Sequence, residues 1–202
     1  MKKMINSSSN ATFKMLKSLL SSRGIKKHNA ALVSGEKVVL ELLRAMPERI
    51  TALIVDSSQS PCEHPEYDDC ECDVYAMGHS LFKSIDIHGT TTPLALVSGG
   101  DFPSADLADF QSRVLCIPFQ DPANVGAVIR SAAAFGVNDI LLLKEAAHPY
   151  LPKSLRAAGT SAFLARFRHG PSIYDLNDHT IPIVALDSSG DRYGTDVIPP
   201  VA

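Results

Sequence analysis

Apolar residues in the first hundred positions of the chain follow alternating helical and extended periodicities. The spacing of Phe13, Leu16 and Leu19 predicts an amphipathic helix over residues 11–20, with Asn10 positioned to cap it. The pattern then predicts an extended run, a helix, two strands, a helical turn and a last strand at residues 31–33, 36–46, 50–55, 73–77, 80–85 and 93–97. This half of the chain is therefore expected to form a small α/β unit.

The second half opens with a near-continuous apolar run at residues 114–119, which is typical of a strand buried in a parallel sheet. A helix is predicted over residues 125–135, because Gly136 stands where many helices end, and a second buried strand over residues 139–143. Together they predict a right-handed βαβ unit. Further helical and extended pieces continue an open doubly wound α/β fold and are predicted at residues 150–157, 163–167, 173–176 and 181–186.

The strongest interruption of these patterns is the sequence Gly-Gly-Asp-Phe-Pro-Ser at residues 99–104. At roughly 150 residues per domain, a chain of 202 residues has room for one to two domains. We therefore predict two domains, residues 1–98 and residues 113–202, joined by a linker over residues 99–112.

The composition is that of a soluble globular protein, with 45% hydrophobic and 20% charged residues. No apolar stretch reaches the ~18 residues that a membrane span needs, and Lys14 and Lys17 interrupt the apolar run nearest the amino terminus. These features predict a cytoplasmic protein without membrane contact. Three of the four cysteines crowd into residues 62–72, which is unlike a disulfide framework and predicts reduced thiols.

The net charge of -3 conceals an uneven distribution of basic and acidic residues. Residues 1–35 carry seven lysines and arginines and no acid, and residues 146–174 also lack acids. Clustered bases of this kind bind nucleic-acid phosphates, although a solvated helix face has the same composition. Residues 56–73 hold seven acids and no base, so they are expected to lie away from an RNA-binding face. The residues expected to contact RNA are Lys14, Lys17, Arg23, Lys26, Lys27, Lys153 and Arg156.

The predicted helix at residues 125–135 carries the most informative chemistry. Arg130 has only glycine and alanine three and four positions away on either side, so another backbone or a ligand can approach closely. Asn124 stands at the helix entrance, where its side chain can cap the first turn and free backbone donors favour anions. A capped helix with an exposed arginine and an alanine-rich packing face explains the same residues without any function.

Residues 121–130 read Asp-Pro-Ala-Asn-Val-Gly-Ala-Val-Ile-Arg, and small residues and Phe-Gly-Val follow. This segment resembles the first signature motif of the SpoU/TrmH family of RNA ribose 2′-O-methyltransferases, in the SPOUT superfamily. Residues 150–163 are similar to that family's Lys-x-x-Arg-Ala-Ser-x-Gly-Ser segment. The basic amino-terminal half, with Leu-Val-Ser-Gly-Glu at residues 32–36 and Gly-Thr-Thr-Thr-Pro at residues 89–93, is similar to the family's appended L30e-like substrate-binding domain.

The resemblance implies an S-adenosylmethionine-dependent enzyme that methylates ribose 2′-hydroxyl groups of structured RNA, ribosomal RNA in preference to transfer RNA, as a homodimer. Its fold would be an L30e-like α/β domain followed by a SPOUT-type α/β methyltransferase domain with a carboxy-terminal knot. Asn124 and Arg130 would be its catalytic residues, with Gly126 as the motif's glycine. A guanidinium binds phosphate bidentately but is a poor base, since its pKa exceeds ~12, so Arg130 would position and activate the hydroxyl. No residue is assigned as proton acceptor.

Two further family motifs, Gly-x-Glu-x-x-Gly and Ser-Leu-Asn, follow a strand like residues 181–186 in the family, and neither occurs in this chain. The family builds its knot and its cofactor pocket from those segments. We therefore expect the 202-residue chain to lack most of its S-adenosylmethionine site and to belong to a longer enzyme, and cofactor-binding residues are not assigned.

Other interpretations fit parts of the sequence. A noncatalytic RNA-binding protein could retain the same fold, and a small-ligand-binding protein on a doubly wound sheet would need neither a knot nor RNA affinity. Cys62, His64, Cys70 and Cys72 could supply zinc ligands, but their spacing differs from that of common zinc sites, and no metal is expected. A hydrolase is disfavoured because the chain lacks a Gly-x-Ser-x-Gly sequence.

Overall fold

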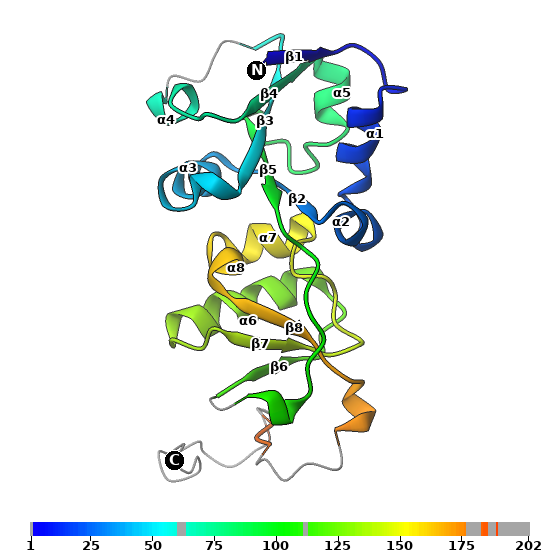
Figure 1. Ribbon diagram of the computed structural model, residues 1–202, viewed down its shortest axis with the longest axis vertical. Helices are drawn as coiled ribbons and strands as arrows, with labels where there is room; N and C mark the ends of the chain where they lie inside the picture. Colours follow the sequence, from blue (N-terminus) through cyan, green and yellow to red (C-terminus); the bar gives the residue numbers. More distant parts are fainter. Residues whose placement is uncertain (1, 60–63, 111–112, 177–182, 186–188, 190–202) are drawn as a thin grey trace.

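The computed structural model describes residues 2–59, 64–110, 113–176, 183–185 and 189. Within these residues the chain has two sheets, and we refer to residues 2–98 as the first unit and residues 113–176 as the second unit (Figure 1). Helices of the second unit lie between the two sheets. The predicted mixed α/β class is confirmed, whereas the L30e-like character of the first unit stays a prediction.

The strands of the first sheet are, among the described residues, β1 (Lys2–Ile5), β2 (Ala30–Val33), β3 (Ile50–Asp56), β4 (Asp73–Met77) and β5 (Leu94–Ser98). Their order is β1-β4-β3-β5-β2; the first three run parallel, and β5 runs antiparallel to its two neighbours. Strand β1 is missing from the sequence prediction because three of its four residues are exposed, which leaves no apolar alternation to recognise. Parallel pairing with β4 holds it at the edge of the sheet.

The described helices of the first unit are α1 (Ala11–Ser18), α2 (Ser22–His28), α3 (Glu36–Ala45), α4 (Pro65–Asp68) and α5 (His79–Lys83), with a short 3-10 helix η1 (Pro47–Arg49). The predicted cap of α1 is confirmed, because the Asn10 side chain accepts a hydrogen bond from the Thr12 N–H at 2.8 Å. Helix α2 is missing from the prediction because only its two central residues are buried. The Ser21 hydroxyl caps it.

Successive residues of strand β5 point to opposite faces of the first sheet. Leu94 and Leu96 pack into an apolar cluster with side chains of α1 and α5. Ala95 and Val97 pack on the other face, into a cluster that includes α3 and side chains of the second unit. This period-two alternation is what a strand covered on both faces by different elements requires.

The second sheet contains, in the described part of the chain, the strands β6 (Leu115–Ile117), β7 (Asp139–Leu142) and β8 (Arg166–His169), which run parallel in that order. The helices α6 (Pro122–Ala134), α7 (Pro152–Ala158) and α8 (Ser161–Leu164) connect them. All three helices contact one another, so they lie on one face of the sheet. Parallel strands that follow chain order, joined by crossovers of one hand, produce this one-sided arrangement.

Among the described residues, the opposite face of the second sheet is covered by irregular chain and 3-10 turns, and no α-helix of the kind that a doubly wound fold predicts lies there. Leu107, in the 3-10 helix η2 (Leu107–Asp109), packs against Leu141 and Leu143. The short 3-10 helix η3 (Ile173–Asp175) follows β8 and adds Leu176 to the same cluster. The strand predicted at residues 181–186 lies mostly outside the described residues, and its described part, residues 183–185, has no regular structure.

The segment predicted as a linker is packed against both units. Gly99 and Gly100 have φ angles of +108° and +131°. A Cβ on Gly99 would lie 2.7 Å from the Arg49 Nη2 atom, and one on Gly100 would lie 2.6 Å from the Ile25 side chain. The positive φ angles favour glycine at both positions, and a side chain there would also displace the ends of the Arg49 and Ile25 side chains. The domain boundaries themselves stay a prediction.

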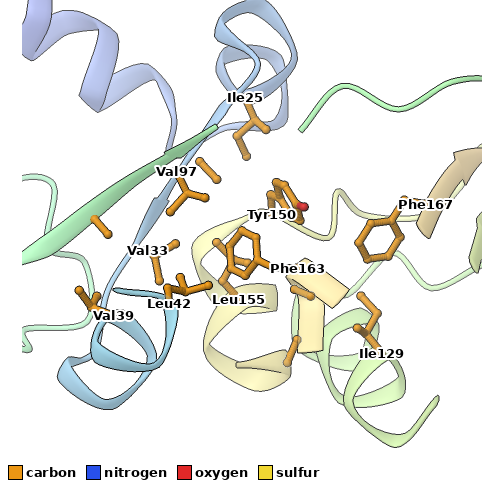
Figure 2. Close-up of a cluster of buried hydrophobic side chains, with 14 of the residues drawn as sticks. Ile25, Val33, Val39, Leu42, Val97, Ile129, Tyr150, Leu155, Phe163 and Phe167 are labelled. Atoms are coloured by element: carbon orange, nitrogen blue, oxygen red, sulfur yellow. The ribbon is translucent and has the colours of Figure 1, made fainter. Parts of the chain in front are cut away.

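One apolar cluster joins the two units, and Figure 2 shows its centre. Val33, Leu42 and Val97 of the first unit face Leu155 and Phe163 of the second. The elements that meet are strands β2 and β5 and helix α3 on one side and helices α7 and α8 on the other. Burial of this kind stabilises the contact by about 25 cal/mol for each Å² of apolar surface removed from water.

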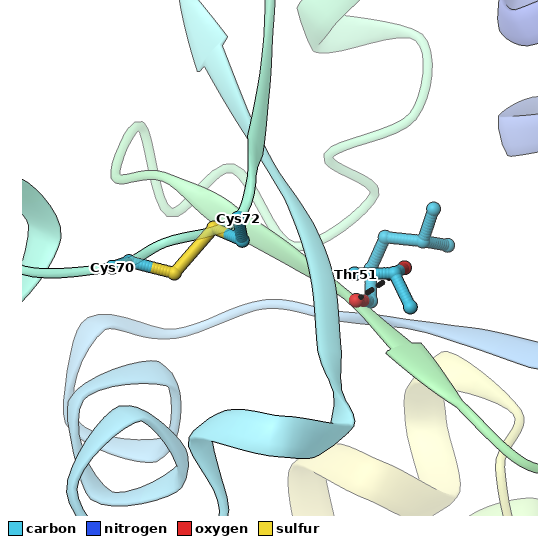
Figure 3. The surroundings of a disulfide bond; sticks show 4 residues. Thr51, Cys70 and Cys72 are labelled. Atoms are coloured by element: carbon cyan, nitrogen blue, oxygen red, sulfur yellow. Dashed lines mark hydrogen bonds between the residues drawn. A yellow bond between two sulfur atoms is a disulfide. The ribbon is translucent and has the colours of Figure 1, made fainter. Parts of the chain in front are cut away.

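The cysteines differ from the sequence prediction. Cys70 and Cys72 form a disulfide beside the sheet, with their Cα atoms 5.3 Å apart (Figure 3). That separation is within the range that a disulfide spans, so the expectation of reduced thiols is wrong for this pair. Cys116 is a free cysteine, and Cys62 lies outside the described residues. None of the described helices is both long enough and apolar enough to cross a membrane.

Candidate nucleic-acid interface

Helix α6, which holds the predicted catalytic residues, begins three residues earlier than its apolar periodicity indicates. The Asp121 carboxylate is its N-cap and accepts hydrogen bonds from the N–H groups of Ala123 at 2.6 Å and Asn124 at 3.2 Å. Pro122 occupies the first helical position, where its missing N–H is no loss. The prediction that Asn124 caps the helix is therefore wrong, and its exposed side chain lies on the first turn.

On one side of α6, small residues allow helix α7 to pack closely against it. A Cβ added to Gly126 would lie 2.2 Å from the carbonyl oxygen of Ser154 and 2.8 Å from the Cβ of Ala157. The space beside Gly126 is therefore occupied by the backbone of α7 and is not open to a ligand. The alternative interpretation of an alanine-rich packing face is thus correct for Gly126.

Arg130 lies one turn beyond Gly126 and is exposed, as Ala127 and Ala134 beside it are. No hydrogen bond or ion pair joins its guanidinium to another described residue. Helical geometry places Arg130 about 9 Å along the axis from Asn124 and roughly 120° around it, so the two side chains leave the helix in different directions. The structure therefore presents Arg130 as an exposed cation able to bind a group outside the fold.

The predicted RNA-binding residues of the first unit lie on helices that are part of its core rather than on a free arm. Phe13, Leu16 and Leu19 bury one face of the α1 region. The neighbouring basic side chains all remain exposed on α1 and α2; they are Lys14, Lys17, Arg23, Lys26 and Lys27. These cations are therefore held in fixed positions by the packing beneath them.

A pocket of about 620 Å³ lies where α2 meets the second sheet. Ser22 and Lys26 of α2 line one side of it. The other side is built from the carboxyl ends of the parallel strands, with Gln120 after β6, Lys144 after β7 and His169 at the end of β8. In open α/β sheets, ligands bind at this edge. The pocket thus joins a predicted RNA-binding helix to the ligand-binding edge of the second unit.

His148 forms the buried wall of this pocket. Its Nε2–H donates to the Gly100 carbonyl at 2.7 Å, and its Nδ1 accepts from the Tyr150 N–H at 3.1 Å. Its ring stacks on Phe102, with centroids 5.3 Å apart. Burial lowers the pKa of His148 to about 4, so the ring is neutral near pH 7. Burial also lowers the pKa of His169.

The two predicted RNA-binding residues of α7 have different surroundings. Lys153 is exposed, and no hydrogen bond or ion pair is formed between it and another described residue. Arg156 is exposed too, but its Nη1 donates to His88 Nδ1 at 3.2 Å. The other ring nitrogen of His88 donates to the Pro152 carbonyl at 3.2 Å. Arg156 therefore helps to join α7 to the first unit.

A second cavity, of about 680 Å³, lies beside the disulfide and has acidic walls. Arg44 binds Glu66 there by an ion pair, and three further carboxylates line the cavity, those of Glu48, Asp69 and Glu71. An excess of carboxylates repels RNA phosphates. Within the described residues, no group of three or more His, Cys, Asp or Glu side chains is arranged to hold a metal ion.

The sequence analysis did not identify Gln120, Lys144, His148 or His169 as site residues. Gln120 and Lys144 directly follow predicted strands, so the rule that ligands bind at the carboxyl ends of parallel strands could have indicated these two. The contribution of α2 had no comparable signal, because it depends on how the two units pack.

Comparison with known proteins adds a family and relatives to this geometry. Residues 111–197 match the SpoU rRNA Methylase family. The chain is 41% identical over 197 residues to the Ribosomal RNA small subunit methyltransferase G 2 of Syntrophobacter fumaroxidans, covering 96% of this chain and 39% of that protein. It is 29% identical over 161 residues to the 23S rRNA (guanosine(2553)-2'-O)-methyltransferase RlmP of Bacillus subtilis, covering 80% of this chain and 62% of that protein. The chain thus spans less than two thirds of either relative.

Solved structures show the same fold. An AdoMet-bound rRNA methyltransferase from Sinorhizobium meliloti is 19% identical, with a TM-score of 0.66 over 86% of this chain and 66% of that one. The SpoU methyltransferase AviRb from Streptomyces viridochromogenes, in complex with AdoMet, is 24% identical, with a TM-score of 0.66 over 83% of this chain and 65% of that one.

Proposed function

We propose that the chain belongs, through residues 111–197, to the SpoU rRNA Methylase family that these residues match, and that it methylates a ribose 2′-hydroxyl of structured RNA, with S-adenosylmethionine as methyl donor. Ribosomal RNA is the proposed substrate, because the names of both relatives specify ribosomal RNA and one specifies the guanosine 2′-oxygen. The expected homodimer and cytoplasmic location belong to the same proposal.

The observation that carries this proposal is the exposed guanidinium of Arg130, which has no partner among the described residues and lies on a helix packed closely against α7. A rigid support matters because methyl transfer requires the attacking oxygen to be held close to the methyl group and in line with its leaving bond. A guanidinium can hold the phosphate next to the target ribose with two parallel hydrogen bonds. A guanidinium does not act as a base in proteins, so Arg130 orients the nucleotide and another group receives the proton.

The described residues do not by themselves form a site that fits S-adenosylmethionine. The cofactor supplies a methyl group on a positively charged sulfonium, whereas the pocket beside α2 contains Lys26 and Lys144 and no carboxylate in its lining. Like charges at close range are unfavourable. We therefore assign to this chain's described residues the binding and orientation of RNA.

Substitution of Arg130 tests the proposal. In the full-length product of the gene, Arg130→Ala is expected to lower single-turnover methylation of saturating ribosomal RNA by two orders of magnitude or more, as expected for the loss of a charged group acting on the transition state. The free energy of unfolding should change by no more than about 0.5 kcal/mol, because the replaced arginine is exposed on a helix. Lys37→Ala, at an exposed helical cation of the first unit, is the matched control and should keep the parental rate.

The chemistry of the product is read by alkaline hydrolysis, because a methylated 2′-oxygen can no longer attack the neighbouring phosphate. Methylation that leaves the RNA fully cleavable would place the methyl group on a base and refute the ribose assignment. RNA binding by the full-length product without any methyl transfer would favour the noncatalytic RNA-binding alternative. A parental rate for Arg130→Ala would show that Arg130 has no part in the reaction.

A further inference from the structure

The pocket between α2 and the second sheet has walls from both units, and each wall contributes a lysine. Lys26 reaches it from the first unit, and Lys144 from the chain that follows β7. Both lysines are exposed at the mouth of the pocket, and the residues that line it include no aspartate or glutamate. Two cations on opposite walls of one cavity produce a site for an anion.

The charged groups near the pocket but outside its lining do not reverse this preference. Asp101 lies close enough to act on His148 and His169, but both rings also respond to the positive charge of Lys26. Asp121 is committed to capping α6 through two backbone N–H groups. Glu145, next to Lys144, interacts electrostatically with that lysine, but its carboxylate accepts hydrogen bonds from the Ser172 hydroxyl and the Ile173 N–H. Neither lysine forms a hydrogen bond through its ammonium group with a described residue, so both can contact a ligand.

The remainder of the lining suits a flat, partly apolar group. Leu142, Leu143, Ala146, Ala147 and Leu151 contribute apolar surface, and Gln120 contributes an amide at the rim. The His169 side chain also lines the pocket, and its Nε2 atom is buried without a hydrogen-bond partner among the described residues. A volume of about 620 Å³ lies within the usual range of roughly 300–1,000 Å³ for small-molecule sites. A nucleobase could thus occupy the interior while its phosphate remains at the lysines.

We propose that this pocket binds one nucleotide of the RNA substrate, with its phosphate between Lys26 and Lys144 and its base against the carboxyl edge of the second sheet. Single-stranded RNA is bound in this way elsewhere, by cations that follow the backbone and surfaces that accept unstacked bases. The identity of the RNA rests on the proposed function, whereas the binding itself does not. Helix α2 then completes a site that neither unit contains alone.

Binding measurements on charge variants test this site without requiring catalysis. The probe is a fluorescein-labelled RNA hairpin with a single-stranded loop, followed by fluorescence anisotropy at several salt concentrations. Lys26→Gln and Lys144→Gln should each weaken binding about fivefold and reduce the slope of log K against log salt by about 1. The matched control is Lys83→Gln, an exposed lysine at the end of α5, which should change affinity less than twofold.

The double variant shows whether the two lysines bind the same phosphate. If they do, the loss in Lys26→Gln/Lys144→Gln will be smaller than the product of the two single losses, because the second removal acts on a contact already weakened. Single losses that multiply fully would show independent contacts and overturn the shared-phosphate site. Affinity unchanged in both single variants would overturn the proposal altogether.

Histidine NMR signals locate the ligand directly. Titration with a short single-stranded oligoribonucleotide should shift the ring signals of His169, which lines the pocket, and leave those of His79 in place. His79 is a suitable reference because it begins helix α5 of the first unit, is absent from the pocket lining, and is hydrogen-bonded to Asp56 at 2.7 Å. An oligonucleotide with uncharged methylphosphonate linkages should produce much smaller shifts.

The same spectra separate this proposal from the proposed function. Shifts of His169 with S-adenosylmethionine but not with RNA would identify a cofactor pocket and refute the nucleotide site. If the lysine variants lose RNA affinity while the full-length protein never transfers a methyl group, the nucleotide site stands and the methyltransferase proposal fails.

Discussion

The two sheets of the protein bury their faces by different means. The first sheet has helices α1 and α5 on one face and α3 with the second unit on the other, and its strand β5 alternates strictly between them. In the described part of the chain, the α-helices of the second sheet lie on one face, and these helices are themselves covered by the first unit. The helices of the second unit thus bury their outer face against the first unit. The candidate pocket lies beside this contact, where α2 meets the second sheet.

The crossing of α6 and α7 leaves no space for a side chain at Gly126. Gly126→Ala is expected to destabilise the protein by about 3 kcal/mol, because the new methyl would lie 2.2 Å from a backbone oxygen that can move only with its helix. The measurement is denaturant unfolding followed by circular dichroism. Gly78→Ala is the control, since Gly78 has an ordinary φ of -66° and open space, and it should change stability by less than about 0.5 kcal/mol. Equal effects would show that α7 adapts freely.

The junction beside the pocket should make stability depend on pH. The pKa of His148 is lowered to about 4, from an unfolded value of 6.5, chiefly by burial. The unfolded state therefore binds more protons between these values, so stability is complete above pH 6.5 and falls as pH decreases towards 4, by about 3 kcal/mol. The free energy of unfolding should be measured across this pH range. In His148→Gln most of its dependence on pH should disappear, whereas His28→Gln, which replaces an exposed histidine, should keep that dependence. An unchanged slope in His148→Gln would contradict the assignment.

Arg49 tests whether the two units unfold together. Its guanidinium donates to the carbonyls of Phe163 and Ser98, both at 3.1 Å, and to the Tyr150 hydroxyl at 3.3 Å. Arg49→Met is expected to lower stability by about 1.5 kcal/mol, because partly buried carbonyls lose their donor. Thermal unfolding should then broaden or separate into two transitions, whereas Arg44→Met, which breaks an ion pair within the first unit, should keep one. A single sharp transition for Arg49→Met would mean that the apolar cluster alone couples the units.

The smallest expected effect is that of Arg156→Ala. Its hydrogen bond to His88 is exposed, so the free energy of unfolding should change by no more than about 0.5 kcal/mol. RNA affinity measured by anisotropy should fall less than for Lys26→Gln, because Arg156 already has a partner from the first unit. A larger loss of affinity than for Lys26→Gln would place the RNA along α7 instead of along α2.

Most elements could be predicted from the chain because their periodicity is local. Helix α3 ends one residue before its predicted end, and strand β4 has its predicted bounds, since apolar alternation and Pro47 define them without reference to the rest of the fold. Strand β1 and helix α2 have mostly exposed residues, so nothing in their own sequence distinguishes them from loops. Strand pairing holds the first and packing around Ile25 holds the second.

The candidate site divides in the same way. Residue chemistry alone determined the basic character of residues 1–35, the family motif around Asn124 and Arg130, and the exclusion of the acidic segment. Tertiary structure alone decided that Asp121 caps α6, that the space beside Gly126 is taken by α7, and that Lys26 and Lys144 line one pocket. The reason is physical: charge and periodicity are properties of neighbouring residues, whereas a pocket forms only when segments distant in the chain pack together and bury the surfaces between them.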